Sequence, residues 1–510
     1  MSCDWIYIIK KNLLRIKAEK RRTKKMKKMK KIICLAMSAA MLLGVAGCGG
    51  AEKTATEDVP TLIYCVAGNP QADLEEVEAA INEIIEPKIQ AKVDIQIIDW
   101  GAYREKMNMK LTAGEYFDIA YGGFDVGTAR KNGALLPLDD LIDEYCSELK
   151  ASLPDYIWDA AKADGVTYYI PNYQCEAYSK AVAVRKDIAE KYNFDVSKVN
   201  KIGDLEPLWQ QVRDNEPTLI PFRMNNLDHF IIDATGKDFG TTQFMNSMMH
   251  VDWNDCKVHT ALDDDYLYKR AKIAYEWMQK GYFRADIATV TDDSSDYASG
   301  RYATFDTSYK PGNEAEIKNQ TGYDYIIKEF TTAKIEHAMP LATKTIINEA
   351  TKYPEKSMQF INLLNTDKEV YNLICFGIEG KHYTKLDDGK IRVNTSGGYC
   401  PNSSWEFGNQ FNAYVQEGQD EDVWEKTIET NENAEVSPLM GIEIVTDDFL
   451  TEMTQCLKIQ KEYGIARMEK GVTDPDSYWD EYKAALEKAG VKKIQESYQK
   501  QIDEFLKNNK

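Results

Sequence analysis

A regular alternation of strand-like and helix-like segments between residues 61 and 121 places the tightest limit on the fold of this chain. Strand segments show runs of β-forming residues or period-two apolar patterns, and helix segments place apolar residues three and four positions apart. The order strand–helix–strand–helix–strand is typical of a parallel sheet covered by helices. The predicted strands are 61–67, 93–97 and 117–121, and the predicted helices are 74–86 and 103–111.

The carboxyl ends of these strands form the expected ligand edge, because open α/β sheets bind ligands there. Asp99 and Trp100 follow the second strand, and Tyr121 ends the third strand next to Gly122 and Gly123. Glycine permits a close approach of backbone to ligand. The alternative is that Trp100 is a core residue, which is the usual fate of tryptophan. We predict that Trp100 and Tyr121 bind ligand.

The length from Cys48 onward is 463 residues, which exceeds what one hydrophobic core usually supports. We therefore expect an α/β fold of two lobes that are joined by a hinge, with candidate crossings near 173–180 and 334–340. The predicted division is 61–172 for the first part of lobe 1, 173–334 for lobe 2, 335–380 for a return to lobe 1, and 381–510 for lobe 2 or a C-terminal region. Later predicted elements include helices at 154–163, 204–213, 266–279, 354–364, 367–376, 447–463, 475–489 and 491–506, strands at 166–170, 180–184, 218–222 and 302–306, and a hairpin at 383–394.

Four more residues complete the predicted ligand-binding set. Tyr173 and Gln174 lie at the first candidate crossing. Asp306 is predicted to end a strand of the second lobe, where its carboxylate could accept hydrogen bonds from hydroxyl groups. Trp405 lies in the loop 396–412, which neither helix nor strand patterns explain. The alternative for Trp405 is again a core position.

The segment before Cys48 is built as a secretory signal. A basic cluster precedes an apolar run of 15 residues, Ile32 to Ala46, which is shorter than the ~20 residues that a membrane-spanning helix needs. Its end, Val45-Ala46-Gly47-Cys48, resembles a bacterial lipobox, in which the cysteine receives a lipid. We predict an upstream segment and signal peptide at 1–47, lipidation of Cys48, and a flexible tether at 48–60. Residues 1–25 fit poorly in front of such a signal, so Met26 or Met29 is the more plausible start.

Charge and cysteine content exclude several classes of partner and site. The net charge is −19, and residues 1–48 carry 13 basic and 2 acidic side chains, so the remainder bears about −30. This argues against nucleic acid and anionic lipid as partners. Seven cysteines follow Cys48, with no spacing typical of metal or redox sites. We expect free thiols, no disulfide framework, no metal and no cofactor.

Motifs that would indicate catalysis are absent from the sequence. It contains no phosphate-binding GxxxxGK[ST], zinc-binding HExxH, dinucleotide-binding GxGxxG or nucleophile GxSxG pattern. The acidic runs 263–265 and 292–293 lack the spacing of a calcium-binding loop, and solvated loops or helix caps are the favoured interpretation. A pair of carboxylates that face each other across a cleft, as in glycosidases, stays open at this point.

Several motifs resemble bacterial extracellular solute-binding lipoproteins of ABC import systems, of the group that includes sugar binders. The matching blocks are Phe117-Asp118-Ile119-Ala120 with Gly133-Ala134-Leu135-Leu136-Pro137-Leu138-Asp139, then Asp164-Gly165-Val166-Thr167-Tyr168-Tyr169-Ile170-Pro171, Gly300-Arg301-Tyr302-Ala303-Thr304-Phe305, and residues 354–362. Residues 373–383, 405–411 and 498–505 resemble a subfamily with a C-terminal domain of unknown function.

The resemblance implies a periplasmic-binding-protein-like fold of type II, in which two α/β lobes close on a ligand. It implies a membrane-anchored, extracytoplasmic receptor, not an enzyme, that delivers a solute to an ABC permease, and we expect a monomer. A saccharide is the favoured solute, because Tyr outnumbers Phe by 30 to 16 and flat rings with polar edges suit sugars. An oligopeptide receptor, a surface hydrolase of saccharides or peptides, and an adhesion lipoprotein are the alternatives.

Overall fold

The computed structural model describes residues 59–163, 165–224, 241–244, 248–263, 265–290, 293–442, 444–464, 468 and 470–508. The chain divides into two compact units, residues 1–58 and 59–510. The predicted signal peptide, Cys48 and nearly all of the predicted tether lie outside the described residues.

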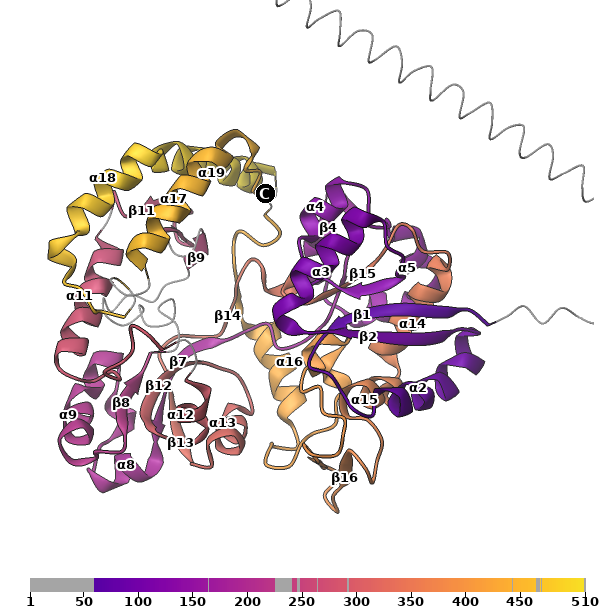
Figure 1. Cartoon of the computed structure of the whole chain (residues 1–510), viewed down its shortest axis with the longest axis horizontal. Helices are drawn as coiled ribbons and strands as arrows, with labels where there is room; N and C mark the ends of the chain where they lie inside the picture. The colour runs from indigo at the N-terminus through magenta and orange to yellow at the C-terminus, as the bar shows by residue number, and fades with distance from the viewer. Residues whose placement is uncertain are drawn as a thin grey trace, which may run out of the picture. The chain divides into compact units, whose positions relative to one another are not determined.

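The first sheet confirms the predicted parallel arrangement of the first three strands (Figure 1). β1 pairs in parallel with both β2 and β3. A strand from a distant part of the chain, β15, then adds antiparallel to β3 and is followed by β6. In sheet order the strands are β2 (Lys92–Ile98), β1 (Thr61–Ala67), β3 (Ile119–Tyr121), β15 (Lys344–Ile347) and β6 (Ile170–Pro171).

Both faces of this sheet are buried, as expected for a sheet covered by helices. Alternate side chains of β1 enter different hydrophobic clusters, with Leu62 and Tyr64 on one face and Cys65 on the other. The helices of this lobe are α2 (Leu74–Ile89), α3 (Trp100–Ala113), α4 (Val126–Lys131), α5 (Asp139–Tyr145), α6 (Ser147–Ser152), α7 (Asp155–Ala160), α14 (Pro354–Thr366) and α15 (Lys368–Phe376).

Two predicted helix ends are wrong. The first helix was expected to stop before Pro87, but α2 continues through Pro87 to Ile89. Ile85 and Ile89 extend its buried stripe by one turn, and this burial stabilises the final turn despite the proline. The helix predicted at 154–163 ends at Ala160, because Lys162–Ala163 (β4) turns at Gly165 and pairs with Val166–Thr167 (β5). The predicted strand 166–170 is accordingly divided between β5 and β6.

The second lobe is built on a mixed sheet with the strand order β13-β7-β12-β8. β12 pairs antiparallel with β7 and parallel with β8. Trp209 lies at the centre of the cluster on one face of the sheet. The elements are β7 (Ser179–Arg185), α8 (Lys186–Lys191), α9 (Glu206–Asn215), β8 (Ile220–Arg223), α11 (Tyr266–Gln279), α12 (Ser294–Ala298), β12 (Tyr302–Tyr309), α13 (Asn313–Thr321) and β13 (Tyr325–Glu329).

The C-terminal helices form a third core with a small antiparallel sheet. Val491, Ile494, Tyr498 and Ile502 are buried there, which confirms the predicted packed stripe. Among the described residues, no helix has the length and apolarity needed to cross a membrane. The elements are β9 (Thr241–Phe244), β10 (Met249–Asp252), β11 (Val258–Thr260), α17 (Leu450–Tyr463), α18 (Trp479–Ala489) and α19 (Val491–Asn508).

The chain passes between the first two sheets twice. The segment 172–178 joins β6 to β7, and the segment 330–343 joins β13 to β15. Within the second segment, β14 (Lys334–Ile335) pairs in parallel with β18 (Glu435–Val436), which follows helix α16 (Val423–Asn433).

One part of the predicted division differs from the packing. Residues 381–510 were assigned to the second lobe or a C-terminal region, but the predicted hairpin, β16 (Tyr383–Lys385) and β17 (Ile391–Val393), packs elsewhere. Its Tyr383 and Ile391, together with Phe407, belong to the core of the first lobe. The apolar side chains of this stretch are buried against α15 and its neighbours, a choice that local patterns do not encode. We therefore propose that the first lobe extends into α16.

Candidate functional site

Three aromatic rings meet at the carboxyl edge of the first sheet. The ring centroids of Trp100 and Trp405 are 5.6 Å apart, those of Tyr121 and Trp405 are 6.1 Å apart, and those of Trp100 and Tyr121 are 6.4 Å apart. We call Trp100, Tyr121 and Trp405 the aromatic cluster. Trp100 is 39% exposed and Trp405 is half-buried, so part of the cluster faces solvent. All three residues belong to the predicted ligand-binding set.

Local structure explains the positions of Trp100 and Tyr121. Asp99 follows β2, and its side chain accepts a hydrogen bond from the Gly101 N–H at 3.0 Å, which caps α3 and makes Trp100 its first residue. Tyr121 is the last residue of β3, and its carbonyl accepts a hydrogen bond from the Tyr103 hydroxyl at 2.6 Å. A Cβ at Gly123 would lie 2.4 Å from the Tyr121 ring, so glycine is needed beside this ring.

Trp405 lies in the loop 396–412, for which the sequence pattern predicted neither helix nor strand. It lies in a short 3₁₀ turn, Ser404–Glu406, whose first carbonyl accepts a hydrogen bond from the Tyr371 hydroxyl at 2.6 Å. The next residue, Glu406, is fully buried and accepts a hydrogen bond from the Ala67 N–H at the end of β1 at 2.7 Å. The turn is therefore fastened to the same sheet edge that carries Trp100 and Tyr121.

The other predicted site residues lie elsewhere. Tyr173 is buried against Phe411, with ring centroids 4.7 Å apart, and is a core residue of the first crossing. Gln174, in the same segment, donates to the Thr343 hydroxyl at 2.7 Å. Asp306 does not end its strand, because β12 continues to Tyr309, and its side chain is only 1% exposed. The structure therefore joins three of the six predicted residues and assigns the other three to the crossing and to the second sheet.

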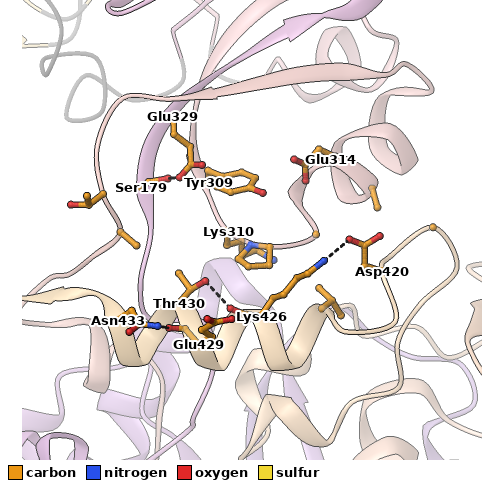
Figure 2. A pocket seen from close by; sticks show the side chains of 17 residues that line it. Ser179, Tyr309, Lys310, Glu314, Glu329, Asp420, Lys426, Glu429, Thr430 and Asn433 are labelled. Atoms are coloured by element: carbon orange, nitrogen blue, oxygen red, sulfur yellow. Dashed lines mark hydrogen bonds and ion pairs between the residues drawn. The ribbon is translucent and has the colours of Figure 1, made fainter. Parts of the chain in front are cut away.

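A separate cavity of about 820 Å³ lies between the strand ends of the second sheet and helix α16 (Figure 2). Lys426 points across it from α16 and pairs with Asp420 at 3.1 Å and Asp422 at 2.9 Å. On the other side of the cavity, the Ser179 hydroxyl donates a hydrogen bond to the Glu329 carboxylate. Its polar lining residues are Ser179, Tyr309, Lys310, Glu314, Glu329, Thr332, Asp420, Lys426, Glu429, Thr430 and Asn433.

Sequence reasoning missed this cavity, because its lining comes from chain segments between residues 179 and 433 and α16 was not predicted. Helix α16 is tied to the first crossing by Asn431. The amide of Asn431 accepts from the Glu176 N–H at 3.0 Å and donates to the Gln174 carbonyl at 2.9 Å. The cavity wall is therefore rigidly connected to the segment that joins the two sheets.

Burial raises the pKa values of two groups at the aromatic cluster, Tyr121 and Glu406. It raises the pKa of Tyr121 to about 12, with a further increase from the nearby Glu406 carboxyl. It raises the pKa of Glu406 to about 8, although the hydrogen bond from the Ala67 N–H and the nearby Ser403 hydroxyl act in the opposite direction. Tyr121 is therefore neutral at pH 7, and so is most of the Glu406 population.

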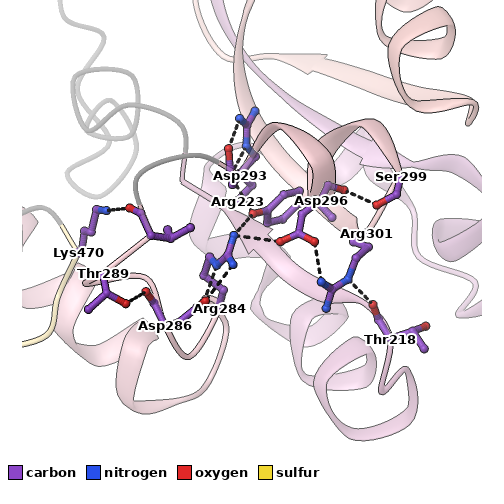
Figure 3. Close-up of polar contacts among 12 residues, drawn as sticks. Thr218, Arg223, Arg284, Asp286, Thr289, Asp293, Asp296, Ser299, Arg301 and Lys470 are labelled. Carbon is purple, nitrogen blue, oxygen red and sulfur yellow. Dashed lines mark hydrogen bonds and ion pairs between the residues drawn. The ribbon is translucent and has the colours of Figure 1, made fainter.

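The acidic runs that were considered as candidate sites make structural contacts. Asp293 forms a two-point ion pair with Arg223, both contacts being 2.7 Å (Figure 3). Nearby, Asp296 bridges Arg284 at 3.0 Å and Arg301 at 2.6 Å. Asp263 accepts a hydrogen bond from the Thr260 N–H at 2.9 Å.

Asp264 and Asp292 lie outside the described residues. Within the described part of the chain, no group of three His, Cys, Asp or Glu side chains is arranged to hold a metal ion. All seven cysteines after Cys48 are free thiols.

Two family models and a related protein match the sequence of this chain. A family model described as bacterial extracellular solute-binding protein matches residues 71–371, and a domain of unknown function matches residues 438–507. A carbohydrate ABC transporter substrate-binding protein of Streptococcus pneumoniae is 28% identical over 483 residues, which cover 92% of this chain and 97% of the relative.

Solved structures agree with the sequence matches. The N-glycan transport solute-binding protein NgtS of Streptococcus pneumoniae superposes with a TM-score of 0.79 at 26% identity, covering 88% of this chain and all of that one. Its complex with Man1GlcNAc gives a TM-score of 0.72 over the same share of this chain. The Streptococcus pneumoniae protein FusA in complex with kestose, at 16% identity and a TM-score of 0.59 over 88% of this chain and all of that one, shows likeness of fold alone.

Proposed function

This chain belongs to the bacterial extracellular solute-binding protein family, and we propose that it is the receptor of an ABC import system that captures an oligosaccharide at the aromatic cluster. The observation that carries the proposal is the meeting of Trp100, Tyr121 and Trp405 at the carboxyl edge of the first sheet. Aromatic faces with polar tips suit sugar rings, and ligands of open α/β sheets bind at this edge.

The relatives support a saccharide over a peptide. The similar sequence is a carbohydrate transport protein, and similar structures of NgtS hold Man1GlcNAc and Man5GlcNAc. An oligopeptide ligand and a hydrolytic activity have no such support. We expect no catalysis, since binding and release are all that transport requires of the receptor.

The proposed mechanism is closure of the two lobes about the segments 172–178 and 330–343. A ligand that contacts both lobes favours the closed state by its difference in affinity for the two states. The cavity beside α16 supports this idea, because its walls come from the second sheet and from a helix tied to the first crossing by Asn431. Asp306 remains a proposed hydroxyl acceptor of the second lobe, and Gln174 a proposed ligand contact at the crossing.

The receptor is proposed to reach the extracytoplasmic face as a monomer that is anchored through a lipid on Cys48. The basic cluster, short apolar run and lipobox-like end support this anchor. Changing Cys48→Ser should release the protein into the medium or leave its precursor uncleaved. A mutant of mature size that stays in the membrane fraction would exclude the lipid anchor.

A ligand screen tests the proposal directly. Thermal shifts would be measured for the chain from Cys48 onward with Man5GlcNAc, other glycans, fructo-oligosaccharides and oligopeptides. A glycan at about 100 times its Kd should add roughly 2.7 kcal/mol of stability. Small-angle scattering with that glycan should show a smaller radius of gyration. Stabilisation by peptides alone would exclude the saccharide proposal, and an unchanged radius with a tight glycan would exclude closure.

A further inference from the structure

Glu406 combines complete burial with incomplete hydrogen bonding directly beneath the aromatic cluster. Its side chain is 0% exposed, and Oε1 accepts the Ala67 N–H at 2.7 Å. Oε2 has no partner in hydrogen-bond geometry among the described residues. A charged carboxylate in this state is costly, because burial removes its hydration and no described donor pairs with Oε2. The neutral acid is the form that this environment tolerates.

The backbone of Glu406 links the same turn to the crossing between the sheets. Its carbonyl accepts a hydrogen bond from the side-chain amide of Asn172 at 2.6 Å. The Asn172 side-chain oxygen in turn accepts from the Thr345 hydroxyl of β15 at 3.0 Å. Glu406 therefore connects the turn Ser404–Glu406 to β1 through its side chain. Through its carbonyl and Asn172, it also connects this turn to the start of the first crossing and to β15.

The groups that face the Glu406 carboxyl come from every element around it. They are Tyr64 and Ala67 of β1, Tyr103 of α3, Tyr121 of β3, Cys375 of α15, and Ser403 and Tyr399 of the chain leading to the turn. The phenols and the thiol have pKa values raised by burial, so they are neutral at pH 7. Burial likewise raises the pKa of Glu406 to about 8, against the opposing effects of the Ala67 N–H and the Ser403 hydroxyl.

We propose that Glu406 is a positioning residue of the saccharide site, which holds Trp405 in the aromatic cluster only while its carboxyl group is protonated. Loss of the proton places an uncompensated charge under the cluster and favours movement of the turn Ser404–Glu406 away from Ala67 and Asn172. Trp405 then leaves its place beside Trp100 and Tyr121. The proposal rests on the proposed function, since it assumes that the aromatic cluster binds glycan.

The decisive experiment compares glycan affinity across pH in wild type and in Glu406→Gln. If binding needs the protonated form, the apparent Kd for Man5GlcNAc rises about tenfold between pH 7 and pH 9, because the competent fraction falls to about one tenth. Glutamine keeps the Oε1 acceptor and cannot ionise, so Glu406→Gln should show less than a twofold change over this range. Calorimetric titration at pH 6, 7, 8 and 9 gives the four values.

A matched control comes from Glu78 of α2, whose Oε2 accepts the N–H of Ile95 in the edge strand β2 at 2.8 Å. Glu78→Gln makes the same chemical change at a carboxyl that also contacts a strand N–H, but away from the cluster, and should keep the wild-type pH profile. A Glu406→Gln protein whose affinity declines at high pH as in wild type would overturn the proposal. So would a folded Glu406→Gln protein that has lost glycan binding at pH 7.

A readout without ligand separates this inference from the proposed function. Tryptophan fluorescence of the free protein should change between pH 7 and pH 9 in wild type, but not in Glu406→Gln or Trp405→Phe. A transition that persists in Glu406→Gln would overturn the positioning role. If wild type shows the transition but binds no glycan at any pH, the role of Glu406 in holding Trp405 stands and the assignment of a saccharide fails.

Discussion

The two lobes use tryptophan clusters in opposite ways. In the second lobe, Trp209 is 0% exposed, and its ring centroid lies 4.8 Å from that of Trp277 and 4.9 Å from that of Phe222. Its ring N–H donates to the Thr304 hydroxyl at 2.7 Å. In the first lobe, Trp100 meets Trp405 and Tyr121 at similar distances but remains 39% exposed.

The difference shows that ring contacts alone do not identify a binding platform. The Trp209 cluster fills the space between α9, α11 and β8, so its apolar surface is already removed from water. The Trp100 cluster lies at a sheet edge and keeps apolar ring surface that a ligand can still cover. Truncation should therefore cost stability in the second lobe and ligand affinity in the first.

Trp209→Ala should give the largest loss of stability, about 3–5 kcal/mol in the free energy of unfolding, because it opens a cavity in a packed core. Urea unfolding followed by circular dichroism measures it, and Trp209→Phe, which keeps an aromatic ring, should lose clearly less. A loss below about 1 kcal/mol in Trp209→Ala would contradict the assignment of this cluster as core.

Asp293→Asn tests the ion-pair network of the second lobe and should cause a loss of stability of intermediate size. Arg223 holds the pKa of Asp293 at about 2, below the unfolded value of about 3.9. The pair therefore contributes stability above about pH 5 and loses it as the pH falls towards 2. With solvent screening, we expect a loss of about 1 kcal/mol at pH 7 that disappears near pH 2.

The control for this network is Asp286→Asn, which removes an exposed partner of Arg284 and should have a smaller effect at pH 7. Urea unfolding at pH 7, 5, 3 and 2 gives the required curves. A loss in Asp293→Asn that persists unchanged at pH 2 would show that the ion pair is not its source.

Trp100→Ala should cost clearly less stability than Trp209→Ala, about 1 kcal/mol, because 39% of the residue is already exposed. It should weaken glycan binding by about tenfold, which is the scale of an aromatic contact. Tyr353→Ala, at a similarly exposed aromatic residue outside the cluster, should cost a similarly small amount of stability and leave glycan affinity unchanged. Normal glycan binding by Trp100→Ala would remove Trp100 from the site.

The sequence by itself determined much of the local structure. The strand Thr61–Ala67 and the helix Tyr266–Gln279 have the predicted bounds. The long helix before Gly114 ends there, with that glycine in a left-handed conformation. These features follow from side-chain period, caps and glycine, which act within a few residues of each other. The same patterns placed Trp100 and Tyr121 at strand ends, and that was enough to predict their common edge.

Only the tertiary structure decided which distant segments meet. β15 enters the first sheet beside β3 more than 200 residues away, and Trp405 joins Trp100 from a loop without local periodicity. Tyr173 and Asp306 sit at plausible chain positions, yet packing buried both. The burial of Glu406 beneath the cluster has no sequence signal either. Contacts of this kind depend on which apolar surfaces and polar groups satisfy one another across the folded core, and one strand or loop pattern cannot specify its partner.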